Sequence, residues 1–137
     1  MKTHTTNYYD TFIEVAPDCP AATGEVPPVK GGVPSVAAMQ YEMISKHPYQ
    51  YTSDEVMFGV YAGRNDISAS EREAARAQFF SKGQPCFRAS PLTKRYGWGI
   101  HCNSEGKVAL YGCETEAYQG FAADEKLKRI KAMKSAK

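Results

Sequence analysis

The chain has 137 residues, with 17 Lys and Arg against 15 Asp and Glu for a net charge of +2; 42% of its residues are hydrophobic and 12% aromatic. A chain of this length forms about one domain and buries about two-thirds of its unfolded surface. Its aromatic content, its lack of a glycine period and its 4 cysteines exclude a disordered tail, a collagen-like repeat and a disulfide scaffold. The near-neutral charge also disfavours a strongly basic nucleic-acid binder.

The first twelve residues are polar and lack the apolar run of a signal peptide, and no window approaches the ~18 apolar residues of a membrane span. We therefore expect a cytoplasmic protein with no membrane partner. In that compartment the cysteines are reduced thiols, and their spacings match no Cys-x-x-Cys zinc or redox motif, so we expect no metal site and no cofactor. The cysteines are Cys19, Cys86, Cys102 and Cys113.

The first third of the chain predicts a strand, a loop and a helix. Aromatic and β-branched residues predict the strand over Tyr9 to Val15. Residues 17–34 contain five prolines and a Gly-Gly pair, which predicts a long surface loop. Ser35 is placed to cap a helix that ends near Lys46.

Two capping boxes open the next two predicted helices. Thr52 with Glu55 begins a helix from Ser53 to about Arg64, although the Gly59-containing interior would also suit a strand, and this alternative stays open. Ser68 with Glu71 begins a helix over about 69–82, which Gly83 is expected to end with a left-handed cap.

The second half predicts a β-hairpin from residues 96–102 and 107–113, which flank the turn-forming quartet Asn-Ser-Glu-Gly. If the turn is centred on Ser104-Glu105, Trp98 pairs with Tyr111 and Ile100 with Ala109. Period-2 alternation then gives the hairpin a core face and a glycine-rich face that includes His101. The predicted core face consists of Tyr96, Trp98, Ile100, Ala109, Tyr111 and Cys113.

The chain is predicted to end with a short helical segment from about Thr115 to Gly120 and a basic helix and tail over 124–137, helical from Asp124 to about Met133. Together the elements predict an α+β fold in a single domain over 1–137. Its antiparallel sheet has at least three strands, including the hairpin of the C-terminal half, and about four to five helices pack on one side of it.

Three segments and a short C-terminal motif resemble a family of small uncharacterised, mainly bacterial proteins that is known as a domain of unknown function. The resemblance runs along the full length, and the third segment is long enough to be specific. It implies a stand-alone, single-domain intracellular protein with no established activity and no known site residues. The segments are HTTNYYDTFIEVAPDCP from His4, PYQYTSDEVMF from Pro48, FFSKGQPCFRASPLTKRYGWGIH from Phe79, and KAMKS from Lys131.

The leading functional hypothesis is the binding of an anionic small molecule. Residues 82–107 hold five basic residues against Glu105 alone, next to loop amides, hydroxyls and aromatics that suit an anion site. The alternative is that the arginines pair with acidic residues of the first half, which carries 6 basic and 10 acidic residues. The predicted cleft is lined by Arg88, Lys94, Arg95, Tyr96, Trp98 and His101.

The second hypothesis is an enzyme, and the sequence leaves open whether any catalysis occurs. Cys86 lies two residues from Arg88, so it could act as a nucleophile with His101, His4 or His47 as base. Glu14 could supply a carboxylate beside the basic cluster. The competing interpretations are a buried thiol, a half-buried histidine and a solvent-facing glutamate.

The third hypothesis is a nucleic-acid or protein interaction module that uses the basic C-terminal helix. The last fourteen residues hold six basic residues against Asp124 and Glu125. No aromatic residues interleave with these lysines as a base-stacking surface would require, which disfavours nucleic acid. The oligomeric state stays open, including a homo-oligomer.

Overall fold

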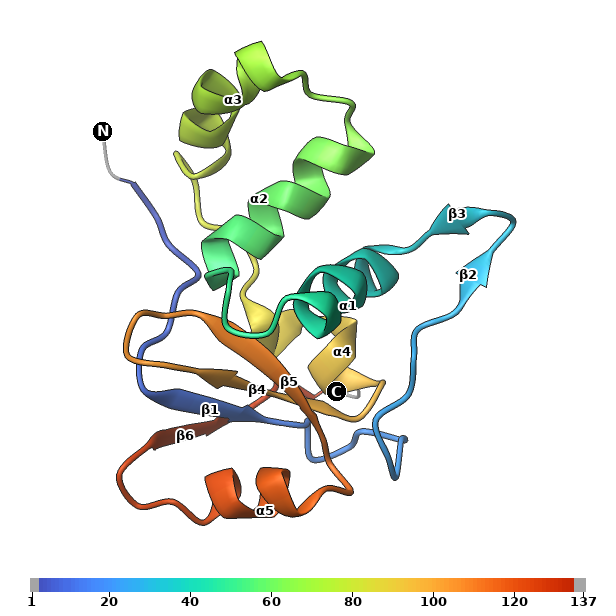
Figure 1. The fold of residues 1–137 in the computed structure, drawn as a ribbon, viewed down its shortest axis with the longest axis vertical. Coiled ribbons are helices and arrows are strands. Elements are labelled where there is room, and N and C mark those ends of the chain that lie inside the picture. Colours follow the sequence, from blue (N-terminus) through green and yellow to red (C-terminus); the bar gives the residue numbers. More distant parts are fainter. Residues whose placement is uncertain (1–2, 135–137) are drawn as a thin grey trace.

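A four-stranded sheet lies between helices on both of its faces (Figure 1). The computed structural model describes residues 3–134, apart from the side chains of Lys30 and Val33. The strand order is β5-β4-β1-β6, in which β1 runs antiparallel to β4 and parallel to β6. This mixed, mostly antiparallel sheet confirms the α+β class. The strands are β1 (Thr11–Glu14), β4 (Trp98–Cys102), β5 (Val108–Gly112) and β6 (Lys128–Lys131).

Strand β1 is buried on both faces because its side chains alternate between two apolar layers. Ile13 contributes to the main core, and Phe12 faces helix α5 (Glu116–Ala122) on the other side. The Phe12 ring lies 5.0 Å from the Tyr118 ring and 5.2 Å from the Phe121 ring, measured between centroids. The strand is shorter than the predicted range of 9–15, because Asp10 has a left-handed φ of 48°. Helix α5 also corrects the expectation that all helices lie on one side.

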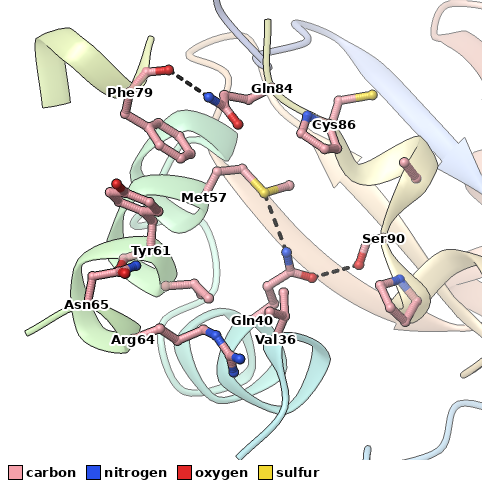
Figure 2. A pocket seen from close by; sticks show the side chains of 14 residues that line it. Val36, Gln40, Met57, Tyr61, Arg64, Asn65, Phe79, Gln84, Cys86 and Ser90 are labelled. Carbon is pink, nitrogen blue, oxygen red and sulfur yellow. Dashed lines mark hydrogen bonds between the residues drawn. The ribbon is translucent and has the colours of Figure 1, made fainter. Parts of the chain in front are cut away.

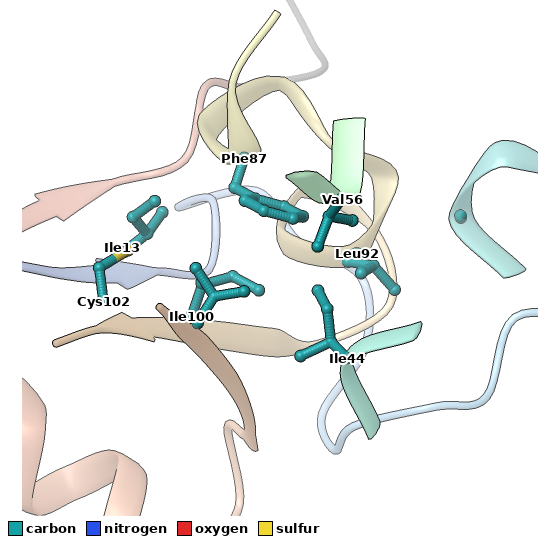
Figure 3. Close-up of a cluster of buried hydrophobic side chains, with 9 residues drawn as sticks. Ile13, Ile44, Val56, Phe87, Leu92, Ile100 and Cys102 are labelled. Carbon is teal, nitrogen blue, oxygen red and sulfur yellow. The ribbon is translucent and has the colours of Figure 1, made fainter. Parts of the chain in front are cut away.

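The main core joins the sheet to α1 (Val36–Lys46), α2 (Ser53–Arg64), α4 (Pro91–Lys94) and the 3-10 turn η2 (Phe87–Ala89). Each of these elements contributes a large buried side chain, and Figure 3 shows them converging on Ile100 of the sheet. Burying such a side chain contributes roughly 1.5–3 kcal/mol. The side chains from the helices and the turn are Ile44, Val56, Phe87 and Leu92.

Helices α1 and α2 begin at the residues that their caps predict. Ser35 Oγ accepts a hydrogen bond from the Ala38 amide at 3.1 Å. Thr52 and Glu55 form both bonds of the capping box, at 3.2 and 2.9 Å. Residues 53–64 are therefore helical, which settles the alternative that the sequence left open.

Gly59 has a packing role that explains why a glycine interrupts the apolar face of α2. A Cβ atom at Gly59 would lie 2.9 Å from Met43 Cε of α1. The missing side chain therefore lets a flexible methionine of α1 pack directly on the backbone of α2.

The third predicted helix is wrong in its length and in its C-cap. It consists of the 3-10 turn η1 (Ala69–Glu71) and α3 (Arg72–Phe79), and Gly83 does not have a left-handed φ. The helix ends early because Phe80 turns into a small apolar cluster with Phe58 and Ala62. Gln84 Nε2 then donates to the Phe79 carbonyl at 2.7 Å, so a side chain caps the helix instead of a glycine.

The predicted loop over 17–34 contains a two-stranded ribbon, β2 (Val29–Lys30) and β3 (Val33–Pro34), that extends from the body (Figure 1). Gly31 and Gly32 connect its strands with φ of 63° and 74°. Two consecutive positive φ angles are typical of a type I′ hairpin turn, which glycine allows without strain.

The predicted register of the β4–β5 hairpin is wrong by one residue. The observed pairs are Trp98 with Gly112, Ile100 with Leu110, and Cys102 with Val108. Gly106 has a φ of 79° and adds a third residue to the turn, so that Asn103 pairs with Lys107.

A shift of one residue moves every side chain of one strand to the opposite face. Leu110 and Val108 therefore face the helical layer with Trp98 and Ile100. Tyr111 lies on the other face, where its ring contacts Phe121 of α5. The predicted core face is thus correct for β4 and wrong for β5.

The predicted basic helix from Asp124 is also wrong, because residues 128–131 form β6. Strand β6 pairs in parallel with β1, and backbone bonds from Lys128 to Asp10 and from Ala132 to Glu14 extend the pairing. Without β6, one edge of the central strand would leave its backbone groups unpaired. Pairing with the sheet therefore outweighs the helical spacing of Leu127, Ile130 and Met133. The last residues of the predicted helix and tail, 135–137, lie outside the residues that the structure describes.

We expect Gly106→Ala to lower the free energy of unfolding by about 1–2 kcal/mol, because alanine is strained in the left-handed conformation. Gly120→Ala is the matched control, since a Cβ at Gly120 in α5 meets open space and alanine favours a helix. Urea denaturation of both variants measures the effect. Equal stabilities of the two variants would contradict the assigned role of the turn.

Candidate functional site

A pocket of about 330 Å³ lies between α1, α2, the end of α3 and the segment 84–91. This volume is within the range of small-molecule sites, roughly 300–1,000 Å³. Its walls are largely apolar, with a few polar side chains on the floor and rim. The lining residues are Val36, Gln40, Met57, Val60, Tyr61, Arg64, Asn65, Phe79, Gln84, Pro85, Cys86, Ala89, Ser90 and Pro91.

Gln40 is one of the two buried polar side chains that line this pocket, with Ser90, and is only 3% exposed. Ser90 Oγ donates to Gln40 Oε1 at 2.6 Å, which fixes the orientation of the amide. Gln40 Nε2 then faces Met57 Sδ at 3.4 Å. A thioether is a weak acceptor, so the amide N–H groups keep most of their capacity to donate.

Ser90 is held by the local fold of the segment 87–94. It is the N-cap of α4, whose first residue is Pro91, and its Oγ accepts from the Leu92 amide at 3.1 Å. Thr93 Oγ1 donates to the Phe87 carbonyl at 2.5 Å, which joins α4 to η2. The hydroxyl that orients Gln40 therefore belongs to a buried, cross-linked turn.

Tyr61 and Phe79 form the aromatic wall, with ring centroids 4.7 Å apart. Figure 2 shows them on the side of the pocket opposite Ser90. At the rim, Asn65 Nδ2 donates to the Tyr61 carbonyl at 2.8 Å. Arg64 extends toward the start of α1, where Nη1 donates to the Pro34 carbonyl at 3.2 Å.

Two larger hollows, of about 520 and 540 Å³, lie on the same helical layer and share Met43 and Gly59. Their charged lining side chains are all exposed, whereas Gln40 and Ser90 are both buried. Buried polar groups that orient a ligand distinguish a binding site from a surface hollow. We therefore take the pocket around Gln40 as the candidate site.

Cys86 lines this pocket, but its thiol faces elsewhere. Its sulfur points away from Gln40 and Ser90 in Figure 2 and lies 3.4 Å from Tyr8 Oη. Burial and this hydrogen bond raise the pKa of Tyr8 to about 12, so the phenol stays protonated beside the sulfur. The expected pairing of Cys86 with a histidine base is not formed, because a tyrosine occupies that position.

The structure does not bring the six residues of the predicted anion cleft together. Trp98 and His101 lie on opposite faces of the sheet, as their spacing along β4 requires. Trp98 packs against Tyr41 of α1, and its Nε1 donates to the Glu25 carbonyl at 2.8 Å. His101 lies under α5, with its ring 4.2 Å from that of Phe121.

The other members of the predicted cleft also have separate roles. Arg88 Nε donates to the Lys131 carbonyl at 2.8 Å, and the Met133 amide donates to the Arg88 carbonyl at 2.8 Å. Arg88 therefore holds the C-terminal strand against η2. Lys94 is half-buried at the end of α4, Arg95 is exposed, and Tyr96 packs against the main core.

Glu14 lies on the α5 face of β1, since it alternates with Ile13 of the core face. Burial raises the pKa of Tyr118 to about 12, and the charge of Glu14 adds to this effect. Glu14 is therefore beside a tyrosine of α5 and not beside the predicted basic cluster.

His101 belongs to a hydrogen-bonded chain that the sequence did not indicate. Tyr49 Oη lies 2.8 Å from His101 Nδ1 and 2.7 Å from Tyr111 Oη. Tyr49 has a left-handed φ of 59°, a strained conformation for an aromatic residue. Burial lowers the pKa of His101, and the charges of Asp10 and Asp124 oppose this effect.

Sequence reasoning missed Gln40 as a site residue; it included Ser90 in the loop of the basic segment but not among the residues predicted to line the cleft. One signal was available: Gln40 lies four residues after Val36 and four before Ile44, on the apolar stripe of its helix. A polar residue on such a stripe requires a buried partner. No local pattern identified Ser90 as that partner, because the two residues are fifty positions apart.

Within residues 3–134 no group of three metal-ligating side chains is assembled. In the same part of the chain, no helix has the length and apolar character needed to cross a membrane.

Fold and site define an α+β protein with one mixed sheet and a largely apolar pocket in its helical layer. The chain belongs to a family of unknown function (DUF6157), whose model matches residues 3–137. This match confirms the resemblance along essentially the full length. No curated protein and no solved structure matches the chain.

The lowered pKa of His101 predicts a pH dependence of stability. Unfolding frees the ring to bind a proton near its ordinary pKa of about 6.5, so the free energy of unfolding should decrease as the pH falls from 7 to 5. His101→Gln should show a shallower decrease, because this proton uptake is removed. Chemical denaturation across this pH range measures both slopes; parallel curves would contradict the prediction.

Proposed function

We propose that this protein binds a small molecule in the pocket around Gln40. One observation carries the proposal: a buried amide, oriented by Ser90, presents N–H groups to a thioether inside an apolar pocket of about 330 Å³. A ligand oxygen is a stronger acceptor than a thioether. Ligand binding would therefore improve the hydrogen bonding of Gln40.

The enzyme alternative has less support from the geometry. Cys86 faces Tyr8, and His101 lies on the opposite side of the sheet from the helical layer. A nucleophile and its base need to be within hydrogen-bond reach. The interaction-module alternative is likewise weakened, because the basic C-terminal segment is an edge strand and not a free helix.

The proposal includes a cytoplasmic location. All four cysteines are free thiols, which supports a reducing compartment. Small-molecule binding is also the leading hypothesis from the sequence. The proposed site differs from the predicted one, because it lies in the helical layer and not at the hairpin. The proposal needs no partner chain, and a homo-oligomer is compatible with it.

Binding can be tested by nuclear magnetic resonance with ring compounds of about ten heavy atoms, such as phenylacetate and 2-phenylacetamide. We expect at least one of them to shift backbone amide signals of Met57, Tyr61, Asn65 and Ala89, which line the pocket. Val36→Trp should abolish these shifts, because the larger side chain fills the pocket from its exposed edge.

Val26→Trp is the matched control, since Val26 is also exposed and does not line the pocket. This variant should keep the shifts. Shifts that map to another surface, or that persist in Val36→Trp, would overturn the proposed site.

A further inference from the structure

We infer that the ligand of this pocket is a carboxylate with an apolar body of about ten heavy atoms, an inference that rests on the proposed function. The size follows from the volume of about 330 Å³ and the ~30 Å³ that one water molecule occupies in the liquid. The chemical class follows from the polar side chains that line the pocket.

The charge of the pocket favours an anion. Arg64 is the one charged side chain among the fourteen lining residues of the described chain, and none of them is an aspartate or glutamate. One of its five N–H donors is used by the Pro34 carbonyl. The remaining donors can bind a carboxylate in the two-point geometry that a guanidinium prefers.

The buried end of the pocket favours the same class. Ser90 occupies the acceptor oxygen of Gln40, so this amide offers donors to a ligand. A carboxylate has two acceptor oxygens and no donor that would be left unpaired. An ammonium group would instead meet the Gln40 N–H groups and the Arg64 charge, which both repel it.

The apolar walls of the pocket favour an apolar body for the remainder of the ligand. Tyr61 and Phe79 present an aromatic surface, and Val36 and Val60 complete an apolar lining. A ring or a short branched chain would bury its surface there, while the carboxylate binds the N–H donors of Arg64 and Gln40. Neither neighbouring hollow has a net positive lining: Glu42 lines one without a basic residue, and in the other Arg72 and Arg76 are balanced by Glu55 and Glu73.

Three probes of similar shape and different charge test the ligand class: phenylacetate, 2-phenylacetamide and 2-phenylethylammonium. We expect phenylacetate to bind roughly tenfold more tightly than the neutral amide, because the charged pair adds a charge-assisted hydrogen bond. The cation should bind most weakly. Titrations followed by amide chemical shifts give the three dissociation constants.

Arg64→Met keeps the aliphatic stem and removes the charge. This variant should remove most of the preference for phenylacetate over the amide, because the carboxylate loses the charged partner that the neutral amide depends on less. Arg72→Met is the control, because Arg72 is an exposed arginine of α3 that lines a different hollow. It should change neither affinity.

The outcomes separate the two proposals. If phenylacetamide binds the pocket as tightly as phenylacetate, or if Arg64→Met keeps the preference for the acid, the carboxylate inference fails and the small-molecule site stands. If none of the three probes shifts the pocket signals, the proposed function fails as well. Arg64 is exposed at the end of α2, so the variant should keep the fold, and its amide spectrum verifies this.

Discussion

The turn at Asn103 to Lys107 sets the side of the sheet on which each residue of β5 lies. Its left-handed Gly106 adds one residue to the loop, and the Asn103 carboxamide oxygen accepts from two turn amides, at 2.9 Å each. The resulting register places Val108 and Leu110 in the core under the helices and Tyr111 beside α5. The packing of both layers against β5 depends on this one turn, because a slip of one residue would exchange the two faces of that strand.

The helical layer contains the candidate site because α1 and α2 pack closely. Gly59 admits Met43 to the backbone of α2, and Ser90 fixes the amide of Gln40 from the turn before α4. The pocket is thus formed by α1, α2, the end of α3 and the segment 84–91, and hydrogen bonds within the fold hold its polar floor in place. Donors held in place in an apolar surrounding are what the proposed binding of a small molecule requires.

The two faces of the sheet have different polar chemistry. On the α5 face, Tyr49, His101 and Tyr111 form a hydrogen-bonded chain in which the strained Tyr49 backbone is held by its neighbours. On the helical face, Cys86 is paired with Tyr8 and Trp98 with the Glu25 carbonyl. Trp98 and His101 therefore contribute to separate environments although they lie on the same strand, because successive side chains of a strand point to opposite faces.

The sequence by itself determined the class of fold, the helix starts at Ser35 and Thr52 and the existence of the β4–β5 hairpin, because caps and turn residues act within a few positions. Tertiary structure decided the register, the strand β6 and the site. Residues 128–131 became a strand because β1 offered an unpaired edge, and Gln40 met Ser90 across fifty residues. The strand β6 and the Gln40–Ser90 contact depend on interactions between distant segments, which the local periodicity of the sequence does not encode.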